Sequence, residues 1–266
     1  MFKNLILSVL LMGALVFCIR PAFAATYLDQ IGVVPETHWI PTSSNVIYSL
    51  DDSVGKGPTG YGNYVGPGYG GQAFDAEAIY ASVANSRLYF GVVTGTKNGW
   101  VEGFLPGDLA IDIGNKGTYE YGVETTGLTH GYGEPSGYHA PSLLAGNIYK
   151  VTSWGQGLNN WLDGLGNQGY VSAPTEILGI DTKTYTSQAI DDFGYYDLGI
   201  IGGEQHYLIQ GSIPISDFSG WNGEFTLHWT QTCGNDFVKV SATPEPASFS
   251  LLGLGLLGLF GFKRKK

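Results

Sequence analysis

Short runs of alternating apolar residues recur along this chain, and glycine-rich stretches separate them. Examples are RLYFGVV, DLAIDIG, TYEYGVE, HYLIQGSI and EFTLHWT, and the chain contains 41 glycines and 17 tyrosines. Alternation with period two over so few residues is typical of β-strands with one buried face, and no stretch with helical period is comparably strong. The sequence therefore predicts an all-β fold, a single antiparallel β-sandwich of jelly-roll-like form with long glycine-rich loops.

The first of two hairpins can be aligned from its apolar face. A two-residue turn at Asn85 and Ser86 gives the pairs Val83–Leu88, Ala81–Phe90 and Ile79–Val92. Continuing this ladder places Glu77, and next to it Asp75, on the core-facing side where the strand begins. These two carboxylates are expected either at the wet end of the sheet or against a cation or a buried partner.

The second hairpin, GDLAIDIGNKGTYEYGVET, carries four acidic residues. A three-residue loop over 115–117, with Gly117 left-handed, gives the apolar pairs Ile113–Tyr119, Ile111–Tyr121 and Leu109–Val123. The opposite face then sets Asp112 against Glu120 and Asp108 against Glu124. Because like charges directly opposed are unfavourable, we expect either a basic neighbour, Lys150 or Arg87, or a calcium ion bound by the four carboxylates.

Three tryptophans are informative. Trp154 and Trp161 lie in the polar, glycine-rich stretch SWGQGLNNWLDGLGNQGY, where indole faces could bind sugar rings or could instead pack as anchors of a long loop. Trp229 alternates with other apolar residues in EFTLHWT and is expected in the core. HWTQTCGND is expected to be the final strand and its turn.

Sequence motifs give no support for catalysis or for a nucleotide cofactor. The pattern GxGxxG occurs three times, but never between the strand and helix of a βαβ unit. GxSxG and HExxH are absent, and the five histidines lack metal-site spacing. We therefore expect a protein that is not an enzyme. The alternative is a secreted hydrolase of matrix polysaccharide, which needs two carboxylates about 5 to 9.5 Å apart across a cleft.

The N-terminus has the order of a secretory signal peptide, with Lys3, an apolar run over 5–17 and then the small residues Ala22 and Ala24. We predict a signal helix over 1–24, removed by signal peptidase after Ala24, and a β-sandwich domain over 25–241. That body has 7 basic and 22 acidic residues, a formal charge of 7 − 22 = −15, so nucleic acid is not an expected partner. Its one cysteine, Cys233, is expected to be buried packing, with an intermolecular bridge or a redox site as alternatives.

The C-terminus, TPEPASFSLLGLGLLGLFGFKRKK, joins a Pro-Glu-Pro triplet to an apolar segment and four basic residues. The segment 247–262 is shorter than the ~20 residues that usually span a bilayer. The basic cluster would stay on the cytoplasmic side and leave the body outside. We predict a transmembrane helix here, which anchors an exported precursor in the inner membrane.

Pro244, Glu245 and Pro246, together with the apolar segment and the basic end, resemble the PEP-CTERM sorting signal of bacterial surface proteins over 243–266. The resemblance implies transient membrane anchoring, cleavage near the triplet by an exosortase, and release or attachment at the cell surface among exopolysaccharides. The body, from GGQAFDAEAIY to GNIYKVTSW, resembles DOMON-like and carbohydrate-binding-module β-sandwiches, which implies ligand binding, often beside calcium. We expect an exported cell-surface or extracellular-matrix protein of biofilms that binds polysaccharide, calcium or both.

Overall fold

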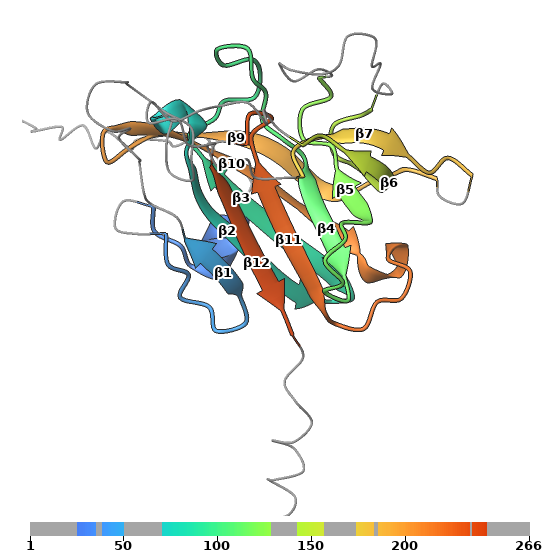
Figure 1. Ribbon diagram of the computed structural model, residues 1–266. Helices are drawn as coiled ribbons and strands as arrows, with labels where there is room; N and C mark the ends of the chain where they lie inside the picture. The colour runs from blue at the N-terminus through green and yellow to red at the C-terminus, as the bar shows by residue number, and fades with distance from the viewer. Residues whose placement is uncertain are drawn as a thin grey trace, which may run out of the picture.

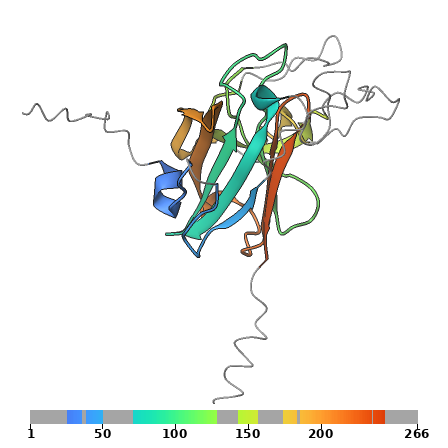
Figure 2. The same cartoon turned by 90° about the vertical axis from the view of Figure 1, so that its left-hand side faces the viewer.

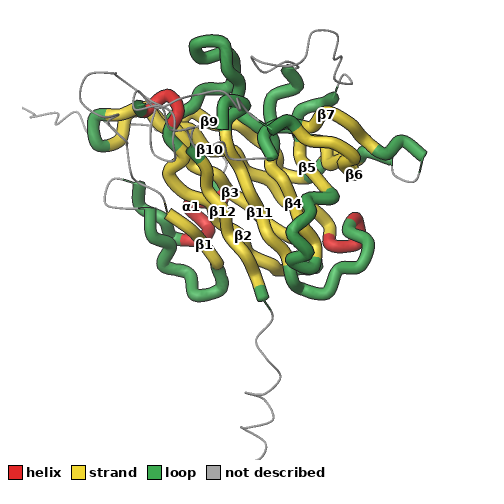
Figure 3. Tube along the Cα trace, viewed as in Figure 1, coloured by secondary structure: helices red, strands yellow, loops and turns green. Residues whose placement is uncertain are grey.

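Two antiparallel sheets packed face to face form the structure (Figure 1). The computed structural model describes residues 26–35, 39–50, 71–128, 143–156, 174–183, 186–234 and 236–243. Strands dominate the described part of the chain, and helix is confined to short segments (Figure 3). The predicted all-β sandwich is therefore confirmed.

The first sheet has five strands, in the order β1 (Ile47–Leu50), β2 (Ala76–Ala84), β3 (Arg87–Thr94), β10 (Glu204–Pro214) and β9 (Asp191–Ile201). The second has the order β12 (Phe237–Ala242), β11 (Phe225–Thr230), β4 (Leu109–Ile113), β5 (Tyr121–Val123), β6 (Asn147–Trp154) and β7 (Ile177–Ile180), with β8 (Gln188–Ala189) also paired to β6. The chain crosses between the sheets three times, after β3, after β8 and after β10. The first and third crossings lead from β3 to β4 and from β10 to β11. Because β3 pairs with β10 and β4 with β11, these two crossings join adjacent strands of one sheet to adjacent strands of the other.

The first hairpin, β2–β3, has the predicted register. Its Cα partners include Val83–Leu88, Ala81–Phe90 and Ile79–Val92. Asn85 and Ser86 have φ values of 49° and 59°, and positive φ at both central residues is the requirement of a type I′ hairpin turn. The apolar alternation and the turn residues thus determined this register together.

A β-bulge changes the start of β2. The register shifts between Ala76 and Ala78, so that Ala76 joins the core between the sheets in place of Glu77. Asp75 and Glu77 are both buried, with 3% and 5% of their surface exposed, so they do not lie at a wet end of the sheet. Glu77 instead contacts a buried partner, because its Oε1 lies 2.7 Å from Nε2 of His206.

The core between the sheets is built from the inward faces of both. Its large, fully buried side chains include Phe90 from one sheet and Ile111, Phe225 and Trp229 from the other. Trp229 was predicted to be in the core, and its Nε1 donates to the carbonyl oxygen of Gly107 at 2.9 Å. Cys233, 1% exposed, is buried as expected.

A second, smaller core covers the outer face of the five-stranded sheet. The short helix α1 (Tyr27–Ile31) lies against this face (Figure 2), and its buried residues pack on Tyr80, Val93 and Leu208. Thr26 caps the helix, because its hydroxyl accepts from the Asp29 amide while the Asp29 carboxylate accepts from the Thr26 amide. Two single-turn 3₁₀ helices, η1 (Gln72–Phe74) and η2 (Ile215–Asp217), complete the regular structure that is described.

Several predictions fall on residues that the structure does not describe. The signal helix with Ala22 and Ala24, the transmembrane helix, Pro244, Glu245, Pro246 and Trp161 all lie outside the described residues. Within the described ranges, none of the helices has the length and apolar character needed to cross a membrane.

Candidate acidic site

The acidic hairpin, β4–β5, also has the predicted register. Leu109 pairs with Val123 and Ile111 with Tyr121, and Gly117 has a φ of +80°, the left-handed conformation expected for it. The predicted partner of Ile113, Tyr119, precedes β5 and is not part of the ladder. The four acidic residues consequently lie on the outer face of the seven-stranded sheet, in two pairs at opposite ends of the hairpin.

The pair nearer the turn, Asp112 and Glu120, is held by the turn itself. The Asp112 carboxylate accepts from the amides of Lys116 at 3.0 Å and Gly117 at 2.7 Å. Glu120 accepts from the Ile113 amide at 3.2 Å and forms an ion pair with Lys116. A lysine within the loop therefore compensates this pair.

The two basic residues that were predicted for this role form ion pairs with other carboxylates. Arg87 forms an ion pair with Asp191 at 2.8 Å, and Lys150 forms one with Asp181 at 3.5 Å. Lys116 lies in the loop of the hairpin itself, four residues before Glu120, and this short separation is the signal that could have identified it.

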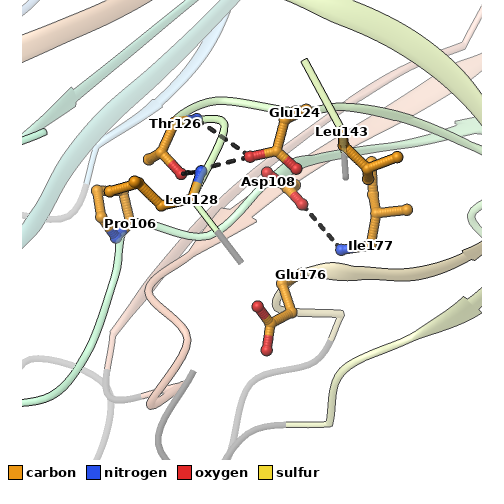
Figure 4. Close-up of a pocket in the computed structure, with 8 residues that line it drawn as sticks. All are labelled: Pro106, Asp108, Glu124, Thr126, Leu128, Leu143, Glu176 and Ile177. Atoms are coloured by element: carbon orange, nitrogen blue, oxygen red, sulfur yellow. Dashed lines mark hydrogen bonds between the residues drawn. The ribbon is translucent and has the colours of Figure 1, made fainter. Parts of the chain in front are cut away.

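The other pair, Asp108 and Glu124, is buried and held by backbone amides. Asp108 accepts from the amides of Thr125 at 3.0 Å and Ile177 at 2.8 Å. Glu124 accepts from the amide of Gly127 at 2.9 Å and from both the amide and the hydroxyl of Thr126. The two carboxyl groups lie side by side, with 3% and 4% of each residue exposed (Figure 4).

A small cavity of about 10 Å³ opens beside this pair, with room for about one water-sized group. Glu176, 8% exposed, lines it from the segment that leads into β7, and Pro106, Leu128 and Leu143 supply apolar wall (Figure 4). Sequence reasoning did not include Glu176, because its position depends on the pairing of β7 with β6, about 50 residues beyond the hairpin. The one sequence signal was the place of Glu176 directly before the apolar run ILGI, which indicates a position at the edge of a sheet.

The environment of the pair disfavours two negative charges. Burial, and then the charge of Glu124, raise the pKa of Asp108 well above its usual range, and Glu176 adds to this effect. Burial also raises the pKa of Glu124, although the Gly127 and Thr126 amides oppose the shift. A shared proton or a bound cation would offset the repulsion.

The described residues include no group of three or more His, Cys, Asp or Glu side chains arranged to hold a metal ion. A cation at Asp108 and Glu124 would therefore need carbonyl, hydroxyl or water oxygens as well. Calcium accepts such mixed oxygen ligands, usually six to eight of them.

Trp154, the described member of the predicted sugar-binding pair, packs against the sheet. Its Nε1 donates to the Tyr119 carbonyl oxygen at 2.8 Å, and its ring lies over Gly122, where a Cβ would come within 2.5 Å of Trp154 Cη2. These contacts are those of a local anchor. A sugar-binding role for Trp154 or Trp161 remains a prediction.

Comparison with known proteins identifies the C-terminal segment. Residues 242–265 match the PEP-CTERM protein-sorting motif. No curated protein and no solved structure matches the chain. The chain thus carries the sorting signal of an exported, membrane-anchored precursor that an exosortase processes for the cell surface.

Proposed function

We propose that the sandwich is a non-enzymatic calcium-binding module of the cell surface or the extracellular matrix. The observation that supports this function best is the buried pair Asp108 and Glu124 beside a cavity of about 10 Å³. Backbone amides hold both carboxylates in place, and a bound cation would relieve their repulsion. Asp112 and Glu120 are engaged by the turn, so the proposed ligands are Asp108 and Glu124, with Glu176 at the cavity wall.

The cavity also bears on the alternative function. A space for one water-sized group suits an ion better than a sugar ring, so this acid pair supports calcium binding rather than hydrolysis of a polysaccharide. Binding of an extracellular polysaccharide elsewhere on the module remains a prediction.

The test is thermal unfolding of the full chain in millimolar calcium and in chelator. Extracellular modules bind calcium with Kd values of roughly 0.1 to 1 mM. At 1 mM calcium, linkage then adds about 0.4 to 1.4 kcal/mol to the free energy of unfolding, or roughly 1 to 6 °C in Tm. We expect the calcium-dependent shift of Tm to be smaller in Asp108→Asn and in Glu124→Gln than in the wild type.

Asp112→Asn is the matched control, because it removes the same charge from the same hairpin. It should lower Tm in both conditions, since the turn loses an acceptor, but it should keep the full calcium-dependent shift. Equal shifts in the wild type, Asp108→Asn and Glu124→Gln would contradict the proposed site.

A further inference from the structure

A second group of buried oxygen atoms lies near the start of β2, away from the acidic hairpin. Both carboxylate oxygens of Asp75 and the side-chain oxygen of Gln231 are buried and have no hydrogen-bond partner among the described residues. Asp75 is 3% exposed and Gln231 is fully buried. Such oxygens are costly to leave unsatisfied in a protein interior, so this group requires an explanation.

Segments distant in sequence bring these residues together. Asp236, in the turn between β11 and β12, is fully buried, and its carboxylate lies against that of Asp75. It accepts from the amides of Ala76 at 2.7 Å and Phe237 at 2.8 Å. Gln231 joins the group because its Nε2 donates to the Phe74 carbonyl oxygen at 2.7 Å, directly before Asp75.

The neighbouring donors are already used. The Thr94 hydroxyl donates to the backbone oxygen of Asp75 at 2.6 Å, and the Thr96 hydroxyl donates to the Ala73 carbonyl oxygen at 2.9 Å. The Glu77 carboxylate lies beside Nε2 of His206 and accepts from the side-chain Nε2 of Gln72. Among the residues that the structure describes, what remains around the Asp75 carboxylate is a set of acceptors.

The electrostatics agree with this geometry. Burial, followed by the charges of Glu77 and Asp236, raises the pKa of Asp75 to about 9. The pocket therefore favours any species that neutralises the two carboxylates, whether a proton or a metal ion. A proton on Asp75 can serve one acceptor, but it leaves the amide oxygen of Gln231 without a donor.

We propose that Asp75, Asp236 and the side-chain oxygen of Gln231 are ligands of a buried calcium ion. Calcium coordinates carboxylate, amide and backbone oxygens in flexible numbers, which fits an all-oxygen set from three segments. Magnesium demands near-octahedral geometry and retains waters, which suits a buried, irregular site less well.

The ion would connect the two sheets at one end of the sandwich. Asp75 precedes β2 in one sheet, whereas Gln231 and Asp236 flank the turn into β12 in the other. An ion that binds the folded chain and not the unfolded one stabilises the fold in proportion to its concentration. This site would make the body more stable in calcium-containing surroundings outside the cell. The buried site does not depend on the calcium binding that is proposed for the hairpin.

The first experiment counts bound ions by native mass spectrometry and calorimetric titration of the full chain with CaCl₂. Asp75→Asn should lose one ion, or bind it about tenfold or more weakly, and MgCl₂ should not replace it. Asp191→Asn is the matched control, because it removes a carboxylate that is 67% exposed and paired with Arg87. It should keep the wild-type ion count. An unchanged count in Asp75→Asn would overturn the proposal.

The second experiment needs no variant, in case Asp75→Asn does not fold. Hydrogen exchange of the wild type is compared in calcium and in chelator. Calcium should slow exchange several-fold at the amides of Ala76 and Phe237, which donate to Asp236. If calcium does not slow hydrogen exchange at these amides, the buried calcium site is overturned. The same result is expected if the two carboxyl groups only share a proton.

The two calcium sites are distinguishable. Asp108→Asn tests only the hairpin and Asp75→Asn only the buried site. An ion lost in Asp108→Asn but not in Asp75→Asn overturns this inference and retains the proposed function, and the reverse pattern overturns the proposed function alone.

Discussion

His228 is buried between two aromatic rings, those of Tyr119 at 5.7 Å and Phe237 at 5.6 Å between centroids. It is 3% exposed, and burial together with the nearby charge of Lys239 lowers its pKa from 6.5 to about 3. The residue is therefore neutral in the folded protein near neutral pH. His206, by comparison, lies with its Nε2 2.7 Å from the Glu77 carboxylate and its ring against that of Trp39.

This buried histidine makes stability depend on pH. The unfolded chain binds a proton on His228 with a pKa near 6.5, whereas the folded chain binds it only near 3. Stability is complete above about pH 6.5 and is lost as the pH falls toward 3. By pH 4.5 the loss should be roughly 2 to 3 kcal/mol. In denaturant unfolding at several pH values, His228→Phe should lose less stability on acidification than the wild type. Parallel pH profiles would refute this role.

At the scale of elements, β5 depends on a glycine. Gly122 has no side chain, and this lets the Trp154 ring and Ile177 lie over the strand. An added Cβ would come within 2.5 Å of Trp154 Cη2 and 2.9 Å of Ile177 Cδ1, both too close. The Trp154 indole thus covers Gly122 on the outer face of the sheet, beside the acidic hairpin.

Gly122→Ala should therefore lower the free energy of unfolding by about 1 to 3 kcal/mol, as overpacking usually does. Trp154→Leu should relieve the clash, so the double variant should be more stable than the sum of the two single effects predicts. Denaturant unfolding of the four proteins measures this coupling. Strict additivity would show that Trp154 does not rest on Gly122.

At the scale of the whole molecule, the sorting motif begins at the end of the sandwich opposite to both proposed calcium sites. β11 is antiparallel to both β4 and β12, so β4 and β12 run in the same direction. Asp108 and Asp236 precede these strands at one end, whereas β12 ends at Ala242, where the sorting motif begins, at the other (Figure 1). A membrane-anchored precursor would present its ion sites away from the point of attachment.

Deleting residues 243–266 should abolish membrane retention and leave the body folded, since the deletion begins after the last residue of β12. The truncated protein should appear in the soluble exported fraction, with a Tm within a few degrees of the full chain. A carbonate wash of membranes, followed by thermal unfolding of the released protein, measures both. Truncated protein that stays on the washed membranes would contradict this assignment.

The sequence by itself determined the features that depend on residues close together in the chain. Period-two alternation and turn residues such as Asn85 and Gly117 were sufficient for the registers of both hairpins, and the order of residues in the tail was sufficient for the sorting signal. The tertiary structure alone decided which distant groups meet. Asp236 reaches the Ala76 amide across 160 residues, and Glu77 meets His206 across 129. Strand pairing and a bulge create those contacts, and no local periodicity encodes which strands pair or where a ladder slips.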